Sequence, residues 1–167
     1  MIEEKNFENG LNKTYALRPA TESDLEFLFR VSTEAMKPVG KALHPDKVFD
    51  EEAEFKKYQT KFVPDDIEIV ISNGVDVGRL RIVRDGESIY VGGIQILPEF
   101  QRQGIGTSIF DDLISESSRT KSPITLEVHD VNLIAVDFYK KIGFQSVGKE
   151  VNKILMKFTP SSEGKHV

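Results

Sequence analysis

The sequence predicts an α+β fold, a mixed sheet with helices on both faces, in the element order βααβββαβαββ. Two observations predict it. Short alternating strands joined by hairpin turns come early, and later a strand, a glycine-rich turn, a helix and a second strand form one βαβ crossover. A chain of 167 residues can bury a sizeable core, so we expect one domain over 14–158, with polar tails at 1–13 and 159–167.

The domain begins with a short strand, Tyr15 to Arg18, followed by a helix. Thr21 with Asp24 three residues later resembles a capping box, and the apolar spacing that follows predicts a helix to about Met36. The next stretch, Lys37 to Asp46, contains two prolines and a glycine and is predicted to be a loop.

A second helix is expected from Phe49 to Phe62. Three aromatic residues at i, i+3 and i+7 predict its buried face: Phe55, Tyr58 and Phe62. The acidic run Asp50 to Glu54 would suit a cationic acceptor. Carboxylates also favour the first turn of a helix, however, and we expect that local role.

The middle of the chain predicts antiparallel strands. Ile67 to Ile71 alternates as a half-buried strand does, and Asn73-Gly74 is a hairpin turn. The partner strand, Val75 to Ile82, changes its apolar phase, which predicts a bulge near Gly78. The later elements follow Asp85-Gly86 and are expected in this order: a strand Ile89–Leu97, a helix with apolar positions from Ile105 to Ile114, a strand Ile124–Val128, a helix Leu133–Ile142 ended by Gly143, and strands near Ser146–Glu150 and Ile154–Phe158.

A basic, glycine-rich segment, Gln101 to Thr107, joins a strand to a helix; we call it the glycine loop. A helix entered through Gly104 and Gly106 leaves its first amide N–H groups unpaired and unshielded at the positive end of the helix dipole. This arrangement predicts an anion site, most naturally for phosphate, with Arg102 as a local cation. The alternative is that the glycines only make a tight turn.

Two better-known phosphate signatures do not fit. The P-loop pattern GxxxxGK[ST] is absent, and Gly104-x-Gly106 lacks the third glycine of the dinucleotide fingerprint, because Ile109 follows. No acidic residue ends a second parallel strand in the required place. A nucleotide-binding domain is therefore the least favoured of the functions we keep.

The glycine loop resembles the acyl-CoA pyrophosphate loop of the GNAT family of N-acetyltransferases, whose signature is [QR]-x-x-G-x-[GA]. Gln101 to Gly106 matches every specified position, and Ile96 and Pro98 agree with the family's strand end. A second motif at family spacing follows the Ile124–Val128 strand, at Asn132, Ala135, Tyr139, Gly143 and Phe144. The chain is therefore identified as a member of this family, which implies the acyl-CoA N-acyltransferase fold from Tyr15 to Phe158.

The resemblance implies an enzyme that transfers the acetyl group of acetyl-CoA directly to a primary amine through a ternary complex. No acyl-enzyme is required, which agrees with a chain that has no cysteine. The backbone N–H of Ile96 is the expected oxyanion donor, and Asn132, which also caps a helix, the expected partner of the pantetheine arm. The expected acetyl-CoA-binding positions are Ile94, Ile96, Arg102, Gln103, Gly104, Ile105, Gly106, Thr107 and Asn132.

Two catalytic roles remain to be filled. An amine is mostly protonated at neutral pH, so a base is useful. Glu127 is the first candidate, because in ribosomal-protein alanine N-acetyltransferases a glutamate five residues before the asparagine has this role; a solvated surface charge is the alternative. His129 lies on the same strand face as Glu127 by alternation and is a second candidate base. Tyr139 is the expected proton donor to the thiolate, unless it is only a core aromatic residue.

Composition limits the other classes of function. A net charge of -5 makes nucleic acid an unlikely partner, and the chain has no long apolar run or signal-peptide pattern, so we expect a cytoplasmic protein with no membrane partner. No metal is expected, since His44 and His166 form no metal-ligand spacing. The acceptor, a small-molecule or peptide amine, is expected to meet residues within Val31 to Pro64. A homodimer and a catalytically silent acyl-CoA-binding sensor module are left open.

Overall fold

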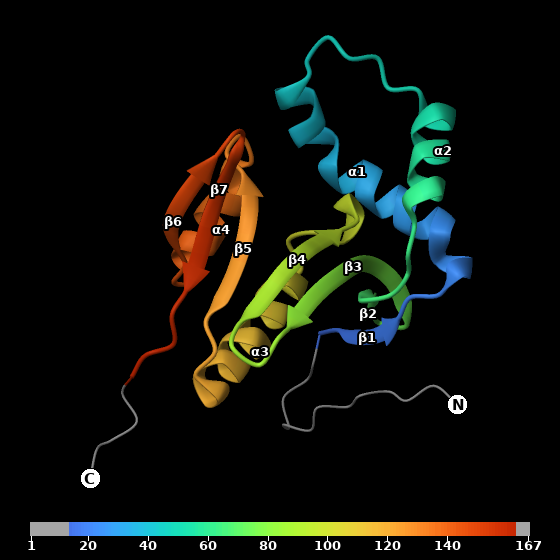
Figure 1. The fold of residues 1–167 in the computed structure, drawn as a ribbon. Helices are drawn as coiled ribbons and strands as arrows, with labels where there is room; N and C mark the ends of the chain where they lie inside the picture. Colours follow the sequence, from blue (N-terminus) through green and yellow to red (C-terminus); the bar gives the residue numbers. More distant parts are fainter. Residues whose placement is uncertain (1–13, 163–167) are drawn as a thin grey trace. The chain divides into compact units, whose positions relative to one another are not determined.

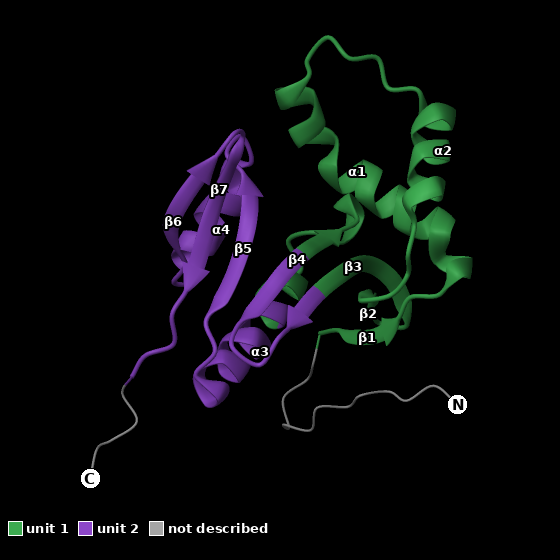
Figure 2. Cartoon of the chain, viewed as in Figure 1, with its two compact units in different colours: residues 1–81, 93–108 green, residues 82–92, 109–167 purple. Residues whose placement is uncertain are grey.

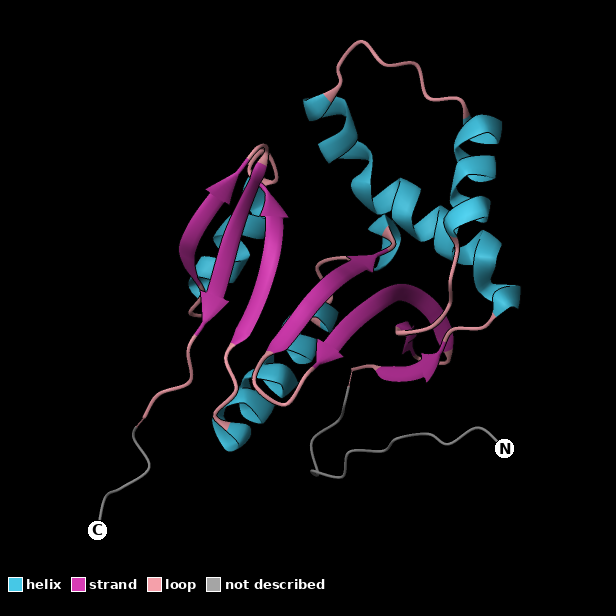
Figure 3. Cartoon of the chain, in the orientation of Figure 1, coloured by secondary structure: helices cyan, strands magenta, loops and turns pink. Residues whose placement is uncertain are grey.

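The computed structural model describes residues 14–162, so the predicted tail at 1–13 and the end of the other tail, with His166, lie outside the described residues. The elements follow the predicted order βααβββαβαββ (Figures 1 and 3), which confirms the α+β class. Their bounds are β1 (Ala16–Pro19), α1 (Leu25–Leu43), α2 (Glu51–Lys61), β2 (Ile67–Ser72), β3 (Val75–Arg84), β4 (Ile89–Ile96), α3 (Ile105–Thr120), β5 (Ile124–His129), α4 (Leu133–Lys141), β6 (Gln145–Glu150) and β7 (Lys153–Phe158), with 3₁₀ turns at Glu22–Asp24 and Pro98–Phe100.

Backbone hydrogen bonds link the strands in the order β1-β2-β3-β4-β5-β7-β6 in a seven-stranded sheet. The pairs β1–β2, β2–β3, β5–β7 and β6–β7 are antiparallel, and β4 pairs with β5 in parallel. The parallel strands are the two that α3 joins, as a βαβ crossover requires. The predicted mixed sheet is therefore confirmed.

The contacts between residues divide the chain into two compact units (Figure 2). Unit 1 contains Met1–Arg81 and Gly93–Ser108, and unit 2 contains Ile82–Gly92 and Ile109–Val167. β3, β4 and α3 each continue from one unit into the other along the chain. One domain over 14–158 stays a prediction, and the units are described separately below.

Unit 1 packs α1 and α2 against β2. Leu28 of α1 is fully buried with Ile67 and Ile69 of β2. The rings of Phe29 and Phe55 lie 5.1 Å apart, centroid to centroid, and join the two helices. The aromatic residues of α2 therefore face the core, as predicted. They are half-buried rather than buried, because α2 covers the edge of this cluster and not its centre.

Helix α1 is longer than the sequence predicts. We expected a loop from Lys37 to Asp46, and this prediction is wrong for residues 37–43. They belong to α1, which continues through Pro38 and ends at Leu43. A proline there removes one backbone hydrogen bond and strains the turn before it. Val39 lies on the same buried face as Val31, two turns earlier, and its burial favours continuing the helix through the proline.

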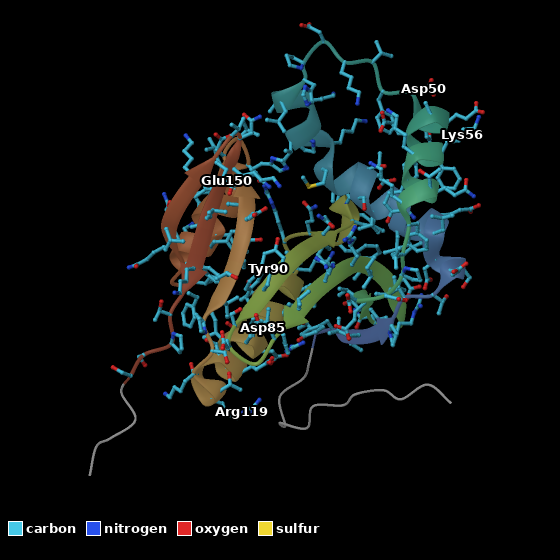
Figure 4. All side chains as sticks on the ribbon, in the orientation of Figure 1. Asp50, Lys56, Asp85, Tyr90, Arg119 and Glu150 are labelled. Carbon is cyan, nitrogen blue, oxygen red and sulfur yellow. The ribbon has the colours of Figure 1, made fainter. Side chains whose placement is uncertain are left out.

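The start of α2 explains the acidic run. Asp50, labelled in Figure 4, is the N-cap. Its carboxylate accepts a hydrogen bond from the Ala53 N–H at 3.1 Å. Glu54 pairs with Lys47 and Lys57 at 3.2 and 3.1 Å. These contacts confirm the local, helix-starting role of the run.

The bulge predicted near Gly78 is present. Val70 pairs with Gly78 and Ile71 pairs with Asp76, so β3 has one extra residue between them. A side chain at Gly78 would collide with the carbonyl oxygen of Gln95, so the close approach of β3 and β4 requires glycine.

Unit 2 is built on an aromatic cluster. Phe110 of α3 packs edge-on against the rings of Phe138, Tyr139 and Phe144, at centroid distances of 5.3 to 5.8 Å. Met156 of β7 is 1 % exposed and belongs to the same unit's core. No helix within residues 14–162 has both the length and the apolar character needed to cross a membrane.

Candidate active site

The glycine loop connects β4 to α3 within unit 1. Two side-chain amides hold it, since the Gln101 Nε2 group donates to the Ile96 carbonyl at 2.8 Å and the Gln103 Nε2 group donates to the Glu99 carbonyl at 3.3 Å. The Ser108 N–H donates to the Gly104 carbonyl at 3.0 Å, which closes the first turn of α3. The loop is thus tied to the end of β4 and to the 3₁₀ turn that follows it.

The two glycines have different roles. Gly104 has φ +82°, a left-handed conformation that favours glycine, whereas Gly106 lies inside the first turn of α3 without a positive φ. No atom lies within 4 Å of the Cβ position of either residue. The N–H groups of Ile105, Gly106 and Thr107 have no acceptor within a helix that begins here. The geometry agrees with the predicted anion site.

Arg102 is the residue of the glycine loop that we predicted as a local cation. Its side chain is exposed, and it forms no hydrogen bond or ion pair with another described residue. The neighbouring Arg30 differs, because it pairs with Glu99 at 2.6 Å and Glu34 at 3.1 Å. Ile94 and Ile96, the other expected contacts in this unit, are half-buried at the end of β4.

The second motif lies in unit 2, where β5 leads into α4. Asn132 is the N-cap, and its Oδ1 accepts from the Ala135 N–H at 3.3 Å. Gly143 ends the helix with φ +106°, and the Phe144 N–H donates back to the Tyr139 carbonyl at 2.9 Å. These contacts give structural reasons for the spacing of Asn132, Gly143 and Phe144.

Tyr139 is 9 % exposed, with Phe110, Phe138 and Phe144 around its ring. Burial raises the pKa of the phenol to about 12, because the phenolate would be poorly solvated. The side chain is therefore protonated at neutral pH and can donate a hydrogen bond.

The two candidate bases share one face of β5. Leu126 and Val128 are buried on the opposite face, as the alternation predicts. Glu127 is exposed, and its Oε2 accepts from the Lys153 ammonium at 3.3 Å. His129 is half-buried, and its Nδ1 has no hydrogen-bond partner within the described chain. Both candidates remain, and the sequence did not indicate the Lys153 contact.

The site residues predicted from the sequence did not include Arg79 or Gln95. Both lie in unit 1, on β3 and β4. The available signal was Arg79 itself, which lies in the middle of a strand directly after the predicted bulge. Across the described residues, no group of three or more histidine, aspartate or glutamate side chains could hold a metal ion.

The chain matches the family described as the acetyltransferase (GNAT) domain over residues 31–162. The chain belongs to the GNAT family. The predicted family, its fold and the enzyme class, an acetyl-CoA-dependent N-acetyltransferase, are confirmed.

Several solved structures share this fold at low sequence identity, and no curated protein matches the chain. The PaiA N-acetyltransferase of Thermoplasma acidophilum, in complex with coenzyme A, is 17% identical with a TM-score of 0.67, over 87% of this chain and 98% of that one. The ribosomal-protein-S18-alanine N-acetyltransferase of Escherichia coli is 17% identical with a TM-score of 0.61, over 92% and 98%. Arabidopsis thaliana Naa50, in complex with the bisubstrate analogue CoA-Ac-MVNAL, is 18% identical with a TM-score of 0.55, over 87% and 99%.

Proposed function

We propose that this enzyme acetylates a primary amine on a small molecule or peptide, by direct attack of the amine on acetyl-CoA in a ternary complex. The observation that carries the proposal is the glycine loop, where open backbone at Gly104 and Gly106 meets unpaired helix amides. This loop suits the pyrophosphate of an acyl-CoA, with Arg102 adding a positive charge.

The remaining cosubstrate contacts follow from the family resemblance. Ile94 and Ile96 would border the pantetheine arm, and Asn132 would add a hydrogen bond to it. Gln103, Ile105 and Thr107 would complete the pyrophosphate site: Ile105 anchors the helix start by its buried side chain, and Thr107 presents its first-turn amide.

The chemical step needs three groups. A backbone N–H at the β4 end, that of Ile96, would stabilise the oxyanion, and Glu127 or His129 would accept the amine proton. Tyr139 would donate a hydrogen bond to the sulfur as the thiolate forms. The sequence holds no cysteine that could carry the acetyl group, which favours direct transfer over a thioester intermediate.

Two fold relatives support parts of this proposal. The Thermoplasma protein was solved with coenzyme A, and Naa50 was solved with a bisubstrate analogue that combines CoA and an acceptor in one molecule. A ligand of that kind mimics the complex in which both substrates are bound together.

Initial-rate kinetics test the ternary mechanism. Rates measured over a grid of acetyl-CoA and amine concentrations should give intersecting reciprocal plots. Parallel plots would indicate an acetyl-enzyme and would overturn direct transfer. A protein that acetyl-CoA stabilises against heat, but that releases no CoA with any amine in a broad screen, would instead be the silent sensor module.

A further inference from the structure

Arg79 of β3 is a half-buried guanidinium without a counter-ion. Its Nη1 donates to the Ser32 hydroxyl of α1 at 3.3 Å, and its buried Nε has no partner. Within residues 14–162 no carboxylate pairs with it. Burial lowers the pKa of Arg79; the Tyr58 phenol raises that pKa and Arg81 lowers it further, but a guanidinium stays charged at neutral pH.

Two other arginines of unit 1, Arg18 and Arg30, do have carboxylate partners. Arg18 donates to Asp24 and Asp76, each at 2.8 Å, and Arg30 pairs with Glu34 and Glu99. A charge that is removed from water normally gains a partner in this way. Arg79 has no carboxylate partner among the described residues, so its guanidinium suits an anion that is bound from solution.

A second unpartnered group lies beside Arg79. The Oε1 atom of Gln95 is also buried without a hydrogen bond. The two side chains converge over Gly93, since a Cβ at Gly93 would lie 3.4 Å from the Arg79 Nη2 and 3.8 Å from the Gln95 Oε1. The ends of the Arg79 and Gln95 side chains thus lie against the same glycine, on neighbouring parts of β3 and β4.

Arg79 also lines a pocket of about 180 Å³ within unit 1. Its lining combines two cations with aromatic and aliphatic side chains: Tyr58, Lys61, Phe62, Val63, Ile67 and Arg79. The first four belong to the stretch that the family resemblance assigns to the acceptor. The pocket therefore has the size and charge for a small organic anion.

We propose that Arg79 binds a carboxylate of the acceptor, so that the substrates are amines that also carry a carboxylate, such as amino acids. This inference rests on the proposed acetyl transfer. The guanidinium can bind the carboxylate through parallel N–H donors, while the Gln95 Oε1 accepts a hydrogen bond from the amine. Arg79 is then a specificity determinant rather than a group that takes part in proton transfer.

Matched substrates test this directly. The standard L-amino acids and their carboxamides, with acetyl-CoA, differ only in the carboxylate. We expect kcat/KM to favour the acids, and Arg79→Met to reduce it for the acids by about 10- to 100-fold, mainly through KM, while the amides are unaffected. Arg30→Met removes an arginine that is already paired and should leave the preference intact. Equal rates for acids and amides in the wild type, or equal losses for both in Arg79→Met, would overturn the proposal.

A binding measurement separates this proposal from acetyl transfer. In an NMR titration, the Nε–H resonance of Arg79, assigned by its loss in Arg79→Lys, should shift with N-acetylglycine and not with N-acetylglycinamide. No shift with either compound overturns the carboxylate site, even if amines are acetylated. A shift with the acid, in a protein that binds acetyl-CoA but acetylates no amine, keeps the carboxylate site and rejects the proposed transfer. The wild-type titration also decides the matter if Arg79→Met does not fold.

Discussion

The environment of Tyr139 makes it a weaker acid than a free phenol. With the pKa of Tyr139 raised to about 12, full proton transfer to a thiolate is unfavourable, because a thiol is the stronger acid, with an ordinary pKa of about 8.5. A hydrogen bond to the sulfur is not subject to this limit, because it needs no complete transfer. We therefore propose that Tyr139 stabilises the developing thiolate through a hydrogen bond.

Tyr139→Phe should lower kcat on the order of 10- to 1000-fold and leave the Kd of acetyl-CoA nearly unchanged. The phenyl ring keeps the contacts with Phe110 and Phe144, so the fold should be retained. Single-turnover rates and calorimetry would measure the two effects. Wild-type turnover in this variant would assign Tyr139 to the core alone.

Glu127 and His129 can be separated by the pH dependence of kcat/KM. If Glu127 is the base, Glu127→Gln should remove the low-pH limb of the profile, where the base becomes protonated, and His129→Ala should keep it. The reverse result would assign the base to His129. If both variants keep the limb, the acceptor loses its proton to water and the enzyme acts mainly by positioning the substrates.

At the start of α3, helix stability and phosphate binding favour different residues at position 106. Gly106→Ala should raise the free energy of unfolding by about 0.5–1 kcal/mol, because alanine restricts the unfolded chain and nothing lies near its Cβ. The same methyl group should hinder the approach of phosphate and weaken acetyl-CoA binding by about tenfold, or about 1.4 kcal/mol. Urea unfolding and calorimetry measure the two quantities.

Gly40→Ala is the matched control, since Gly40 lies in α1 and also has no atom within 4 Å of its Cβ position. It should gain similar stability with an unchanged Kd. If Gly106→Ala also binds acetyl-CoA normally, the phosphate site does not lie over Gly106.

The junction between β1 and α1 depends on an ion-pair network. Arg18 holds Asp24, which also accepts from the Thr21 N–H at 2.8 Å, as the predicted capping box requires. The hydrogen bond from Arg18 is the main cause of the lowered pKa of the Asp24 carboxyl, which is buried. A carboxylate whose pKa is lower in the folded state stabilises the protein above its unfolded pKa, and this stabilisation is lost as the pH falls further.

Asp24→Asn should therefore lower the free energy of unfolding by about 1–3 kcal/mol at neutral pH. The difference from the wild type should shrink as the pH falls below 3.8, the ordinary pKa of aspartate, toward the folded pKa. Glu52→Gln, which removes an exposed pair with Lys56, should change little at any pH. A pH-independent loss in Asp24→Asn would mean that packing, and not charge, is responsible. Urea titrations at several pH values would measure this.

For the whole molecule, the two units are linked by the chain itself. β3, β4 and α3 each begin in one unit and end in the other, so unfolding either unit breaks two strands and a helix that continue into the other unit. We expect one calorimetric transition with equal calorimetric and van't Hoff enthalpies. Acetyl-CoA should raise its midpoint as a single peak. Two transitions, of which acetyl-CoA moves only one, would contradict the expectation of one domain.

The element order and the family could be predicted from the sequence, because both rest on local chemistry. Alternation, helical spacing, Asn73-Gly74 and the two glycines of the glycine loop act over a few residues each. The same locality explains the prediction of the bulge at Gly78 and of the capping roles of Thr21 and Asn132. The candidate residues on β5 and α4 came from motif spacing, and their roles remain to be measured.

Features that depend on residues far apart in the chain became visible in the folded protein alone. α1 continues through Pro38 because Val39 gains burial, which no local rule registers. The pKa of Tyr139 rises because a cluster from α3 and α4 excludes water. Arg79 and Gln95 both lie against Gly93, and nothing in the sequence indicates that these two side chains are close together. Burial and desolvation are properties of the assembled chain, so they cannot be obtained from a stretch of sequence alone.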